Sequence, residues 1–97
     1  MFSLSFHPDV KNDTQSSYDW YQLQAHGLGD DFITELESAF NTISSIPQTW
    51  PKFGANHYRF LLSRFPFLVI YQIQSQHIYI IAIMHNSKRP GYWLKRT

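Results

Sequence analysis

The hydrophobic positions of this chain change their spacing near its middle. Between residues 9 and 46, apolar side chains recur every three or four positions, as they do in helices with one buried face. Between residues 58 and 85, they gather in short β-branched and aromatic runs bounded by turn residues, as they do in strands. The pattern therefore predicts helices first and most of a sheet afterwards.

Two helices are predicted in the first half. The first covers residues 9–25, because Pro8 and the acidic residue after it suit the first turn of a helix. The second begins at Asp30 or Asp31 and is stopped by Pro47. Its apolar stripe is the most regular in the chain and consists of Phe32, Leu36, Ala39, Phe40, Ile43 and Ile46. The link between the helices is short and contains two glycines, which predicts an antiparallel hairpin.

Four strands are predicted around these helices. A short one covers residues 2–6, where apolar side chains alternate with serine. Three more cover residues 58–62, 67–73 and 78–85, and residues 74–76 form the tight link of the last hairpin. The order strand–helix–helix–strand–strand–strand predicts an α+β domain over residues 1–97. In it, a helical hairpin packs on one face of a small, mainly antiparallel sheet.

The last strand is apolar on both faces. Simple alternation places Ile78, Ile80, Ala82 and Met84 on one face and Tyr79, Ile81 and Ile83 on the other. An antiparallel sheet with one solvated face would instead alternate between apolar and polar residues. One face is expected to pack on the helices. The other is expected to be covered by the C-terminal tail, residues 86–97, or by a partner chain.

Composition excludes several kinds of site. The 97 residues contain no cysteine, so neither a disulfide nor a thiolate metal site can form. The sequence has no glycine-rich phosphate loop and no carboxylate cluster for Mg²⁺, so neither a metal nor a cofactor is expected. The longest apolar runs are too short to span a bilayer, and the N-terminus does not resemble a secretory signal. A cytoplasmic location is therefore expected.

Charge is divided unevenly along the chain. All seven carboxylates precede residue 38, while seven of the eight lysines and arginines follow it. The net charge is thus −6 over residues 1–37 and +7 over residues 38–97, with histidine neutral. The positive half favours phosphate, nucleic acid or an acidic protein as partner.

Three residues of the strand region carry candidate chemistry. Arg59 lies in an otherwise apolar strand with no nearby carboxylate, so it is expected to reach solvent, to pair with an acid of the helices, or to bind an anionic ligand. Arg64 is either a solvated turn residue or a phosphate-binding residue. His85 ends the last strand, where it could transfer protons near neutral pH or serve only as a hydrogen-bonding residue.

The tail mixes basic and aromatic residues, which is typical of surfaces that contact phosphates and stack bases. Lys88, Arg89 and Tyr92 are the candidates for such contacts. Trp93 could stack on a ligand, or it could anchor the tail on the open face of the sheet.

Three motifs occur together in a fixed order. They are Arg59-x₄-Arg64-Phe-Pro, the apolar hairpin that follows it, and His85-x₃-Arg89-Pro-x-Tyr92-Trp. In this order and length, the chain resembles the RelE/ParE family, the toxins of bacterial type II toxin–antitoxin pairs. The resemblance implies the fold predicted above. It also implies an acidic antitoxin that wraps the toxin in a hetero-oligomer.

The resemblance leaves two mechanisms open. A RelE-like toxin would cut mRNA on the ribosome without a metal; Arg59 would then hold the phosphate and His85 or Tyr92 would transfer the proton. A ParE-like toxin would bind and inhibit DNA gyrase. The modest net charge, the single lysine (Lys52) in the loop before the strand of Arg59, and the strand ending Ala82-Ile-Met-His85 favour the ParE-like branch. Under either mechanism, the residues expected to contact the target or its phosphates are Arg59, Arg64, Lys88, Arg89 and Trp93.

Overall fold

The predicted order of elements is confirmed by a computed structural model, which describes residues 2–89 and 91–96. The elements are β1 (Ser3–Phe6), α1 (Asp9–Gln24), α2 (Leu28–Ser45), β2 (Tyr58–Leu61), β3 (Phe67–Gln74) and β4 (His77–His85). Short 3-10 helices, η1 and η2, cover Pro47–Thr49 and Tyr92–Arg96. The sheet has the order β1-β4-β3-β2, with β1 parallel to β4 and the other pairs antiparallel. The α+β class is thus confirmed.

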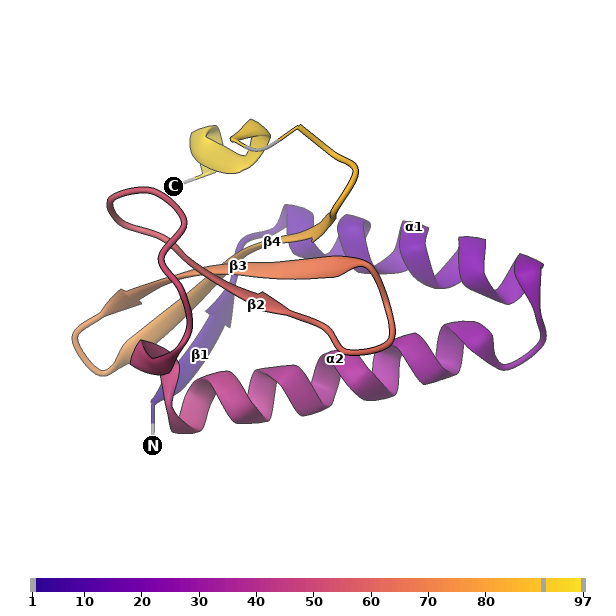
Figure 1. The fold of residues 1–97 in the computed structure, drawn as a ribbon, viewed down its shortest axis with the longest axis horizontal. Helices are drawn as coiled ribbons and strands as arrows, with labels where there is room; N and C mark the ends of the chain where they lie inside the picture. The colour runs from indigo at the N-terminus through magenta and orange to yellow at the C-terminus, as the bar shows by residue number, and fades with distance from the viewer. Residues whose placement is uncertain (1, 90, 97) are drawn as a thin grey trace.

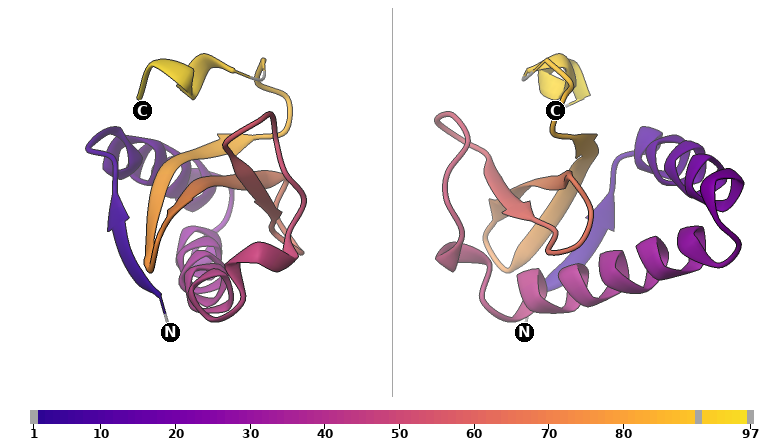
Figure 2. Two further views of the ribbon diagram at one scale, coloured as in Figure 1. Left: turned by 90° about the vertical axis from the view of Figure 1, so that its left-hand side faces the viewer. Right: turned by 45° about the vertical axis from the view of Figure 1, so that its right-hand side comes forward.

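The two helices form the predicted antiparallel hairpin and cover one face of the sheet (Figure 1). The C-terminal segment lies on the opposite side of the sheet from α2 (Figure 2). The sheet is therefore the middle layer, and its two faces bury two separate groups of side chains.

The link between the helices is shorter than predicted. α1 ends where Ala25 becomes extended, and α2 begins at Leu28 rather than at Asp30 or Asp31. Gly27 permits this early start because its φ of 85° is costly for any residue with a Cβ. Gly29 then lies inside α2, where a Cβ would sit 2.6 Å from Cγ of Gln22 and 2.7 Å from the carbonyl oxygen of Tyr18. Glycine at this position lets the two helices approach closely.

The larger core lies between the helices and the sheet. Its aromatic centre joins Tyr21 of α1 and Phe32 of α2 to Phe65 and Phe67, with ring centroids 5.0–5.4 Å apart for the closest pairs. Burying each such side chain contributes roughly 1.5–3 kcal/mol. Tyr71 is fully buried in the same core, and its hydroxyl donates to a backbone carbonyl of η1 at 2.6 Å. Burial raises the pKa of this tyrosine far above its ordinary value, so it remains a neutral donor.

A β-bulge in β4 changes which residues face the helices. The strand register shifts between Ile70 and Tyr71, which pair with Ala82 and Ile80, so Ile81 is the extra residue. Ile81 and Ala82 both face away from the helices, while Ile83 packs in the helix-side core. The prediction from simple alternation was therefore wrong for Ala82, Ile83 and Met84, because an inserted residue reverses the faces of those that follow.

The face away from the helices is covered by the C-terminal segment, one of the two covers expected. Trp93 of η2 is only 3% exposed and packs in a cluster with Ile70, Ile81, Ala82 and Met84. Its ring lies 4.6 Å from that of His57 and 5.5 Å from that of Phe53. Among the roles considered for Trp93, the structure favours the anchor over a free stacking surface.

Candidate functional site

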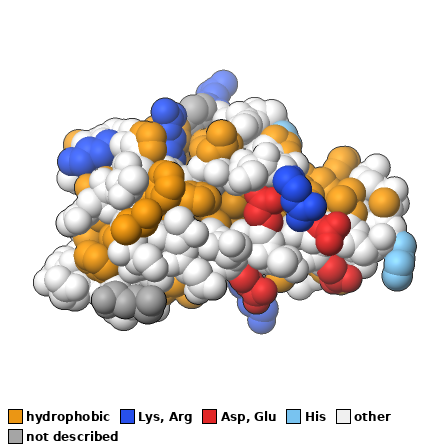
Figure 3. Space-filling model, turned by 60° about the horizontal axis from the view of Figure 1, so that its bottom comes forward, with side chains coloured by type: hydrophobic (Ala, Val, Ile, Leu, Met, Phe, Trp, Pro, Cys, Tyr) orange, Lys and Arg blue, Asp and Glu red, His pale blue; other side chains and the backbone are white. Residues whose placement is uncertain are grey.

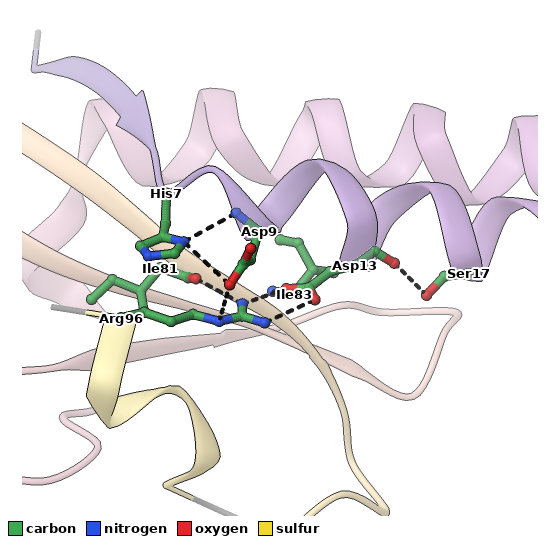
Figure 4. A network of polar contacts seen from close by, with 7 residues as sticks. All are labelled: His7, Asp9, Asp13, Ser17, Ile81, Ile83 and Arg96. Atoms are coloured by element: carbon green, nitrogen blue, oxygen red, sulfur yellow. Dashed lines mark hydrogen bonds and ion pairs between the residues drawn. The ribbon is translucent and has the colours of Figure 1, made fainter.

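Asp13 of α1 and Arg96 of η2 are 83 residues apart in sequence but meet in a polar network (Figure 4). The guanidinium of Arg96 donates to both carboxylate oxygens of Asp13, at 2.8 and 3.2 Å, and its Nε lies 3.6 Å from Asp9. Both paired side chains are about 15% exposed. Hydrogen bonding to Asp13, the largest effect, raises the pKa of Arg96.

The network also completes the edge of the sheet. β1 ends at its pairing with Ile80, and β4 continues beyond it. Past that point the N–H of Ile83 donates to Asp13 at 3.1 Å, and the carbonyl of Ile81 accepts from Arg96 at 3.1 Å. Two side chains thus replace the missing strand and satisfy backbone groups that would otherwise lack partners. Neither Asp13 nor Arg96 was predicted as a site residue, because nothing in the local sequence of either residue indicates the other.

A groove of about 340 Å³ lies beside this network, between α1, the ends of β3 and β4, and the tail. It is called the α1–tail groove below. Trp20, Tyr21, Phe67 and Ile83 supply its apolar surface. His85, Lys88 and Tyr92 line its opposite side. Three of the predicted site residues are therefore brought together here.

His85 occupies the sheet end of the groove on the side of the helices, because the bulge places it on the same face as Ile83. Its ring meets Phe67 edge-on at a centroid distance of 5.1 Å. Its Nδ1 accepts a hydrogen bond from the backbone N–H of Ser87 at 3.0 Å, and the Ser87 hydroxyl lies 2.7 Å from the same nitrogen. An acceptor Nδ1 places the proton of the neutral ring on Nε2. Neutral His85 is therefore a hydrogen-bond donor at Nε2.

Tyr92 lies between two cations. Nζ of Lys88 is 5.6 Å from the centre of its ring, and the guanidinium carbon of Arg96 is 5.3 Å from it. Burial, the largest effect, and the nearby Asp13 raise the pKa of the Tyr92 hydroxyl. This tyrosine is thus a neutral group held in place by cation–π contacts.

Arg59 lies on the opposite face of the sheet from His85. The β2 register pairs it with Ile70, whose side chain faces away from the helices, and its guanidinium lies 5.4 Å from the ring centre of Phe53. No ion pair joins Arg59 to a carboxylate within residues 2–89 and 91–96. The expected pairing with a helix acid was therefore wrong. β2 turns Tyr58 and Phe60 toward the helices and so turns Arg59 away from them.

Arg64 is the strand-region arginine that reaches a helix acid. Its Nε lies 3.1 Å from Glu35 of α2. The same carboxylate accepts the backbone N–H groups of Ser63 at 2.5 Å and Arg64 at 3.0 Å. Desolvation acts to raise the pKa of Glu35, but these hydrogen bonds and the charge of Arg64 together lower it below its usual value. Arg64 is more than a solvated turn residue, although its side chain remains 62% exposed.

The remaining tail residues divide into exposed and buried. Arg89 is exposed beside Lys88, and Trp93 is buried on the sheet. Pro90, which belongs to the tail motif, lies outside the described residues, as does Thr97.

On the underside of the molecule, carboxylates gather in one half, and hydrophobic side chains form a band across the other half (Figure 3).

Within residues 2–89 and 91–96, the structure has neither a candidate metal site nor a candidate membrane span. No group of three or more histidines and carboxylates there could hold a metal ion. No helix there is long and apolar enough to cross a membrane.

Comparisons with known proteins point in one direction. Residues 4–90 match the family described as the ParE toxin of the type II toxin–antitoxin system parDE. Among solved structures, a chain of the chromosomal ParDE toxin–antitoxin system from P. aeruginosa is similar in fold. The TM-score is 0.76 at 16% identity, covering 88% of this chain and 96% of that one. No curated protein sequence matches significantly. Since the family match spans most of the chain, this protein belongs to the ParE toxin family of type II toxin–antitoxin systems.

Proposed function

We propose that this protein inhibits growth by binding DNA gyrase and is neutralised by an acidic antitoxin. Membership of the ParE family supports the general role of a toxin. The choice of a binding toxin over a nuclease depends on one observation, namely that Arg59 and His85 lie on opposite faces of the sheet. A phosphate held by Arg59 would be separated from His85 by the sheet itself.

The tautomer of His85 supports the same choice. A base that removes the 2′-hydroxyl proton of RNA needs a free nitrogen facing the substrate. Nδ1 of His85 is occupied by the Ser87 N–H, so Nε2 carries the proton of the neutral ring. His85 is therefore suited to donate a hydrogen bond and poorly suited to accept that proton.

The cations that remain exposed support a protein target. Arg59, Lys88 and Arg89 carry no ion pair to a carboxylate among the described residues. Arg59 and Lys88 also lie against aromatic rings, and exposed cations of this kind steer and anchor an acidic protein partner. Gyrase in the cytoplasm and the antitoxin are the proposed partners, and no cofactor is required.

A RelE-like ribonuclease is the second candidate, because His85, Lys88 and Tyr92 share one groove. A cation, a histidine and a tyrosine can serve metal-free phosphoryl chemistry. In this case Tyr92 would have to take the part of the base, although its raised pKa makes deprotonation harder.

Induction in growing bacteria separates the two candidates. The proposed function predicts growth arrest with gyrase-linked DNA damage and intact transcripts. Arrest with transcripts cut at ribosomes would establish the ribonuclease instead. Unimpaired growth without any partner gene would contradict both.

A further inference from the structure

The α1–tail groove has the size of a side-chain pocket. Its volume of about 340 Å³ lies at the lower end of the range for ligand sites, roughly 300–1,000 Å³. Such a space holds one or two bulky side chains of a partner. The groove is open along α1, so a peptide segment could lie along it.

One wall exposes aromatic surface that the described residues leave uncovered. Trp20 is 57% exposed although it belongs to a largely polar helix. Exposed tryptophan beside a concavity is typical of interfaces, where it often carries much of the binding energy. This wall favours an apolar anchor residue from a partner.

The opposite wall is positively charged. Lys88 lines the groove, Arg89 is adjacent in sequence, and the Nε2–H of His85 is available as a donor. Asp13 is the carboxylate among the lining residues, and Arg96 already neutralises it. This wall therefore favours carboxylates on the partner.

The helix wall argues against nucleic acid. α1 carries Asp9, Asp13 and Asp19 against a single lysine. Arg96 pairs with the first two, so Asp19 is the carboxylate of this helix that would repel a polyphosphate lying along it. A peptide can instead place an apolar residue against α1 and its carboxylates against the tail.

The tail wall is fixed by residues outside the family match. Tyr92 and Arg96 lie beyond residue 90, where that match ends. Arg96 holds Tyr92 through its ring and is itself held by Asp13. The contacts of the C-terminal segment therefore hold the tail wall of the groove against α1.

We infer that the α1–tail groove binds a segment of an acidic partner protein, which inserts one bulky apolar side chain against Trp20 and places carboxylates beside Lys88. This binding site rests on the proposed function, because the antitoxin is taken as the natural source of the segment. Asp13 and Arg96 are positioning residues that hold the tail wall in place.

The test begins with a random 12-residue peptide library displayed on phage and selected on the purified chain. Enriched peptides should be acidic and carry a bulky apolar residue. A fluorescent synthetic copy of the most enriched peptide is then titrated in an anisotropy assay. Trp20→Ser and Lys88→Glu should each weaken binding at least tenfold, about 1.4 kcal/mol. Lys88→Arg should restore it.

Two matched variants control for general effects. Leu23→Ser removes exposed apolar surface from the same helix outside the groove lining, and Lys95→Glu makes the same charge change elsewhere in the tail. Each should change affinity less than twofold. Equal losses in the control variants, basic enriched peptides, no enrichment, or displacement by single-stranded oligonucleotide would overturn the inference. Because no gyrase is present, the result is independent of whether gyrase is the target.

Discussion

Asp13 and Arg96 form a two-point hydrogen-bonded ion pair that fastens the C-terminal segment to the first helix. The pair also forms hydrogen bonds with the backbone carbonyl of Ile81 and the backbone N–H of Ile83, where β4 extends beyond the end of β1. One contact therefore joins three parts of the fold: the helix, the sheet edge and the tail. Loss of this ion pair should destabilise the helix, the sheet edge and the tail together.

Replacing Arg96 with methionine should destabilise the fold by about 2–3 kcal/mol, because Asp13 would be left as a mostly buried charge without its partner. Urea unfolding measures the change. Asp13→Asn alone should also destabilise the fold. The double variant should lose less free energy of unfolding than the sum of the losses in the two single variants. Lys95→Met, an exposed neighbour, should leave the midpoint unchanged. Strictly additive effects would show that the two residues do not act as a pair.

Glu35 should make stability depend on pH. Its folded pKa lies below the unfolded value of 4.5, so the ionised form stabilises the fold above that pH. This contribution is lost as pH falls through the folded pKa. Urea midpoints measured from neutral to strongly acidic pH should therefore decline less steeply below 4.5 in Glu35→Gln than in the unchanged chain. Identical slopes would mean that Arg64 and the Ser63 amide do not hold the carboxylate in solution.

Gly29→Ala should destabilise the helical hairpin by about 1–3 kcal/mol, because the added methyl group would meet the backbone of Tyr18. Thermal unfolding followed by circular dichroism measures the shift. Thr34→Ala, at an exposed position further along α2, serves as a comparison on the same helix. A Gly29→Ala variant as stable as the unchanged chain would imply that the helices can separate at no cost.

The helices were predictable to within a few residues, since their apolar stripe must follow the helical period. The start of α2 was missed because it depends on the left-handed backbone of Gly27, which periodicity does not reveal. The faces of the last strand were predicted correctly only as far as the bulge at Ile81. A bulge arises from pairing between strands and leaves no mark in the spacing of one strand alone.

The candidate site was predictable in its residue types and less so in its geometry. Lys88, His85 and Tyr92 do gather in one groove. Arg59 does not join them, because strand register decides its face. Strand register also explains why Arg64, and not Arg59, forms the ion pair with a helix acid. Glu35 can reach the turn that carries Arg64, while the face of the sheet that carries Arg59 is turned away from the helices.

His85→Gln should separate the two candidate mechanisms. Glutamine retains an N–H donor near the position of Nε2 but cannot take a proton, so a gyrase-binding toxin should keep most of its toxicity. A ribonuclease in which Tyr92 is the base and His85 gives a proton to the leaving oxygen should lose activity by about 10²–10⁴-fold. Growth inhibition after induction gives the result, with protein levels matched by immunoblot. Complete loss of toxicity in a folded His85→Gln protein would count against the binding mechanism.

The most direct test of the proposed function is the supercoiling of relaxed plasmid by DNA gyrase with the purified chain added in increasing amounts. Supercoiling should fall as the chain is added, and Arg59→Glu, which reverses an exposed charge, should weaken the inhibition. Topoisomerase I relaxation in the same buffer controls for effects on DNA alone. Undiminished supercoiling at a large excess of folded chain over gyrase would contradict the proposal that this chain inhibits DNA gyrase.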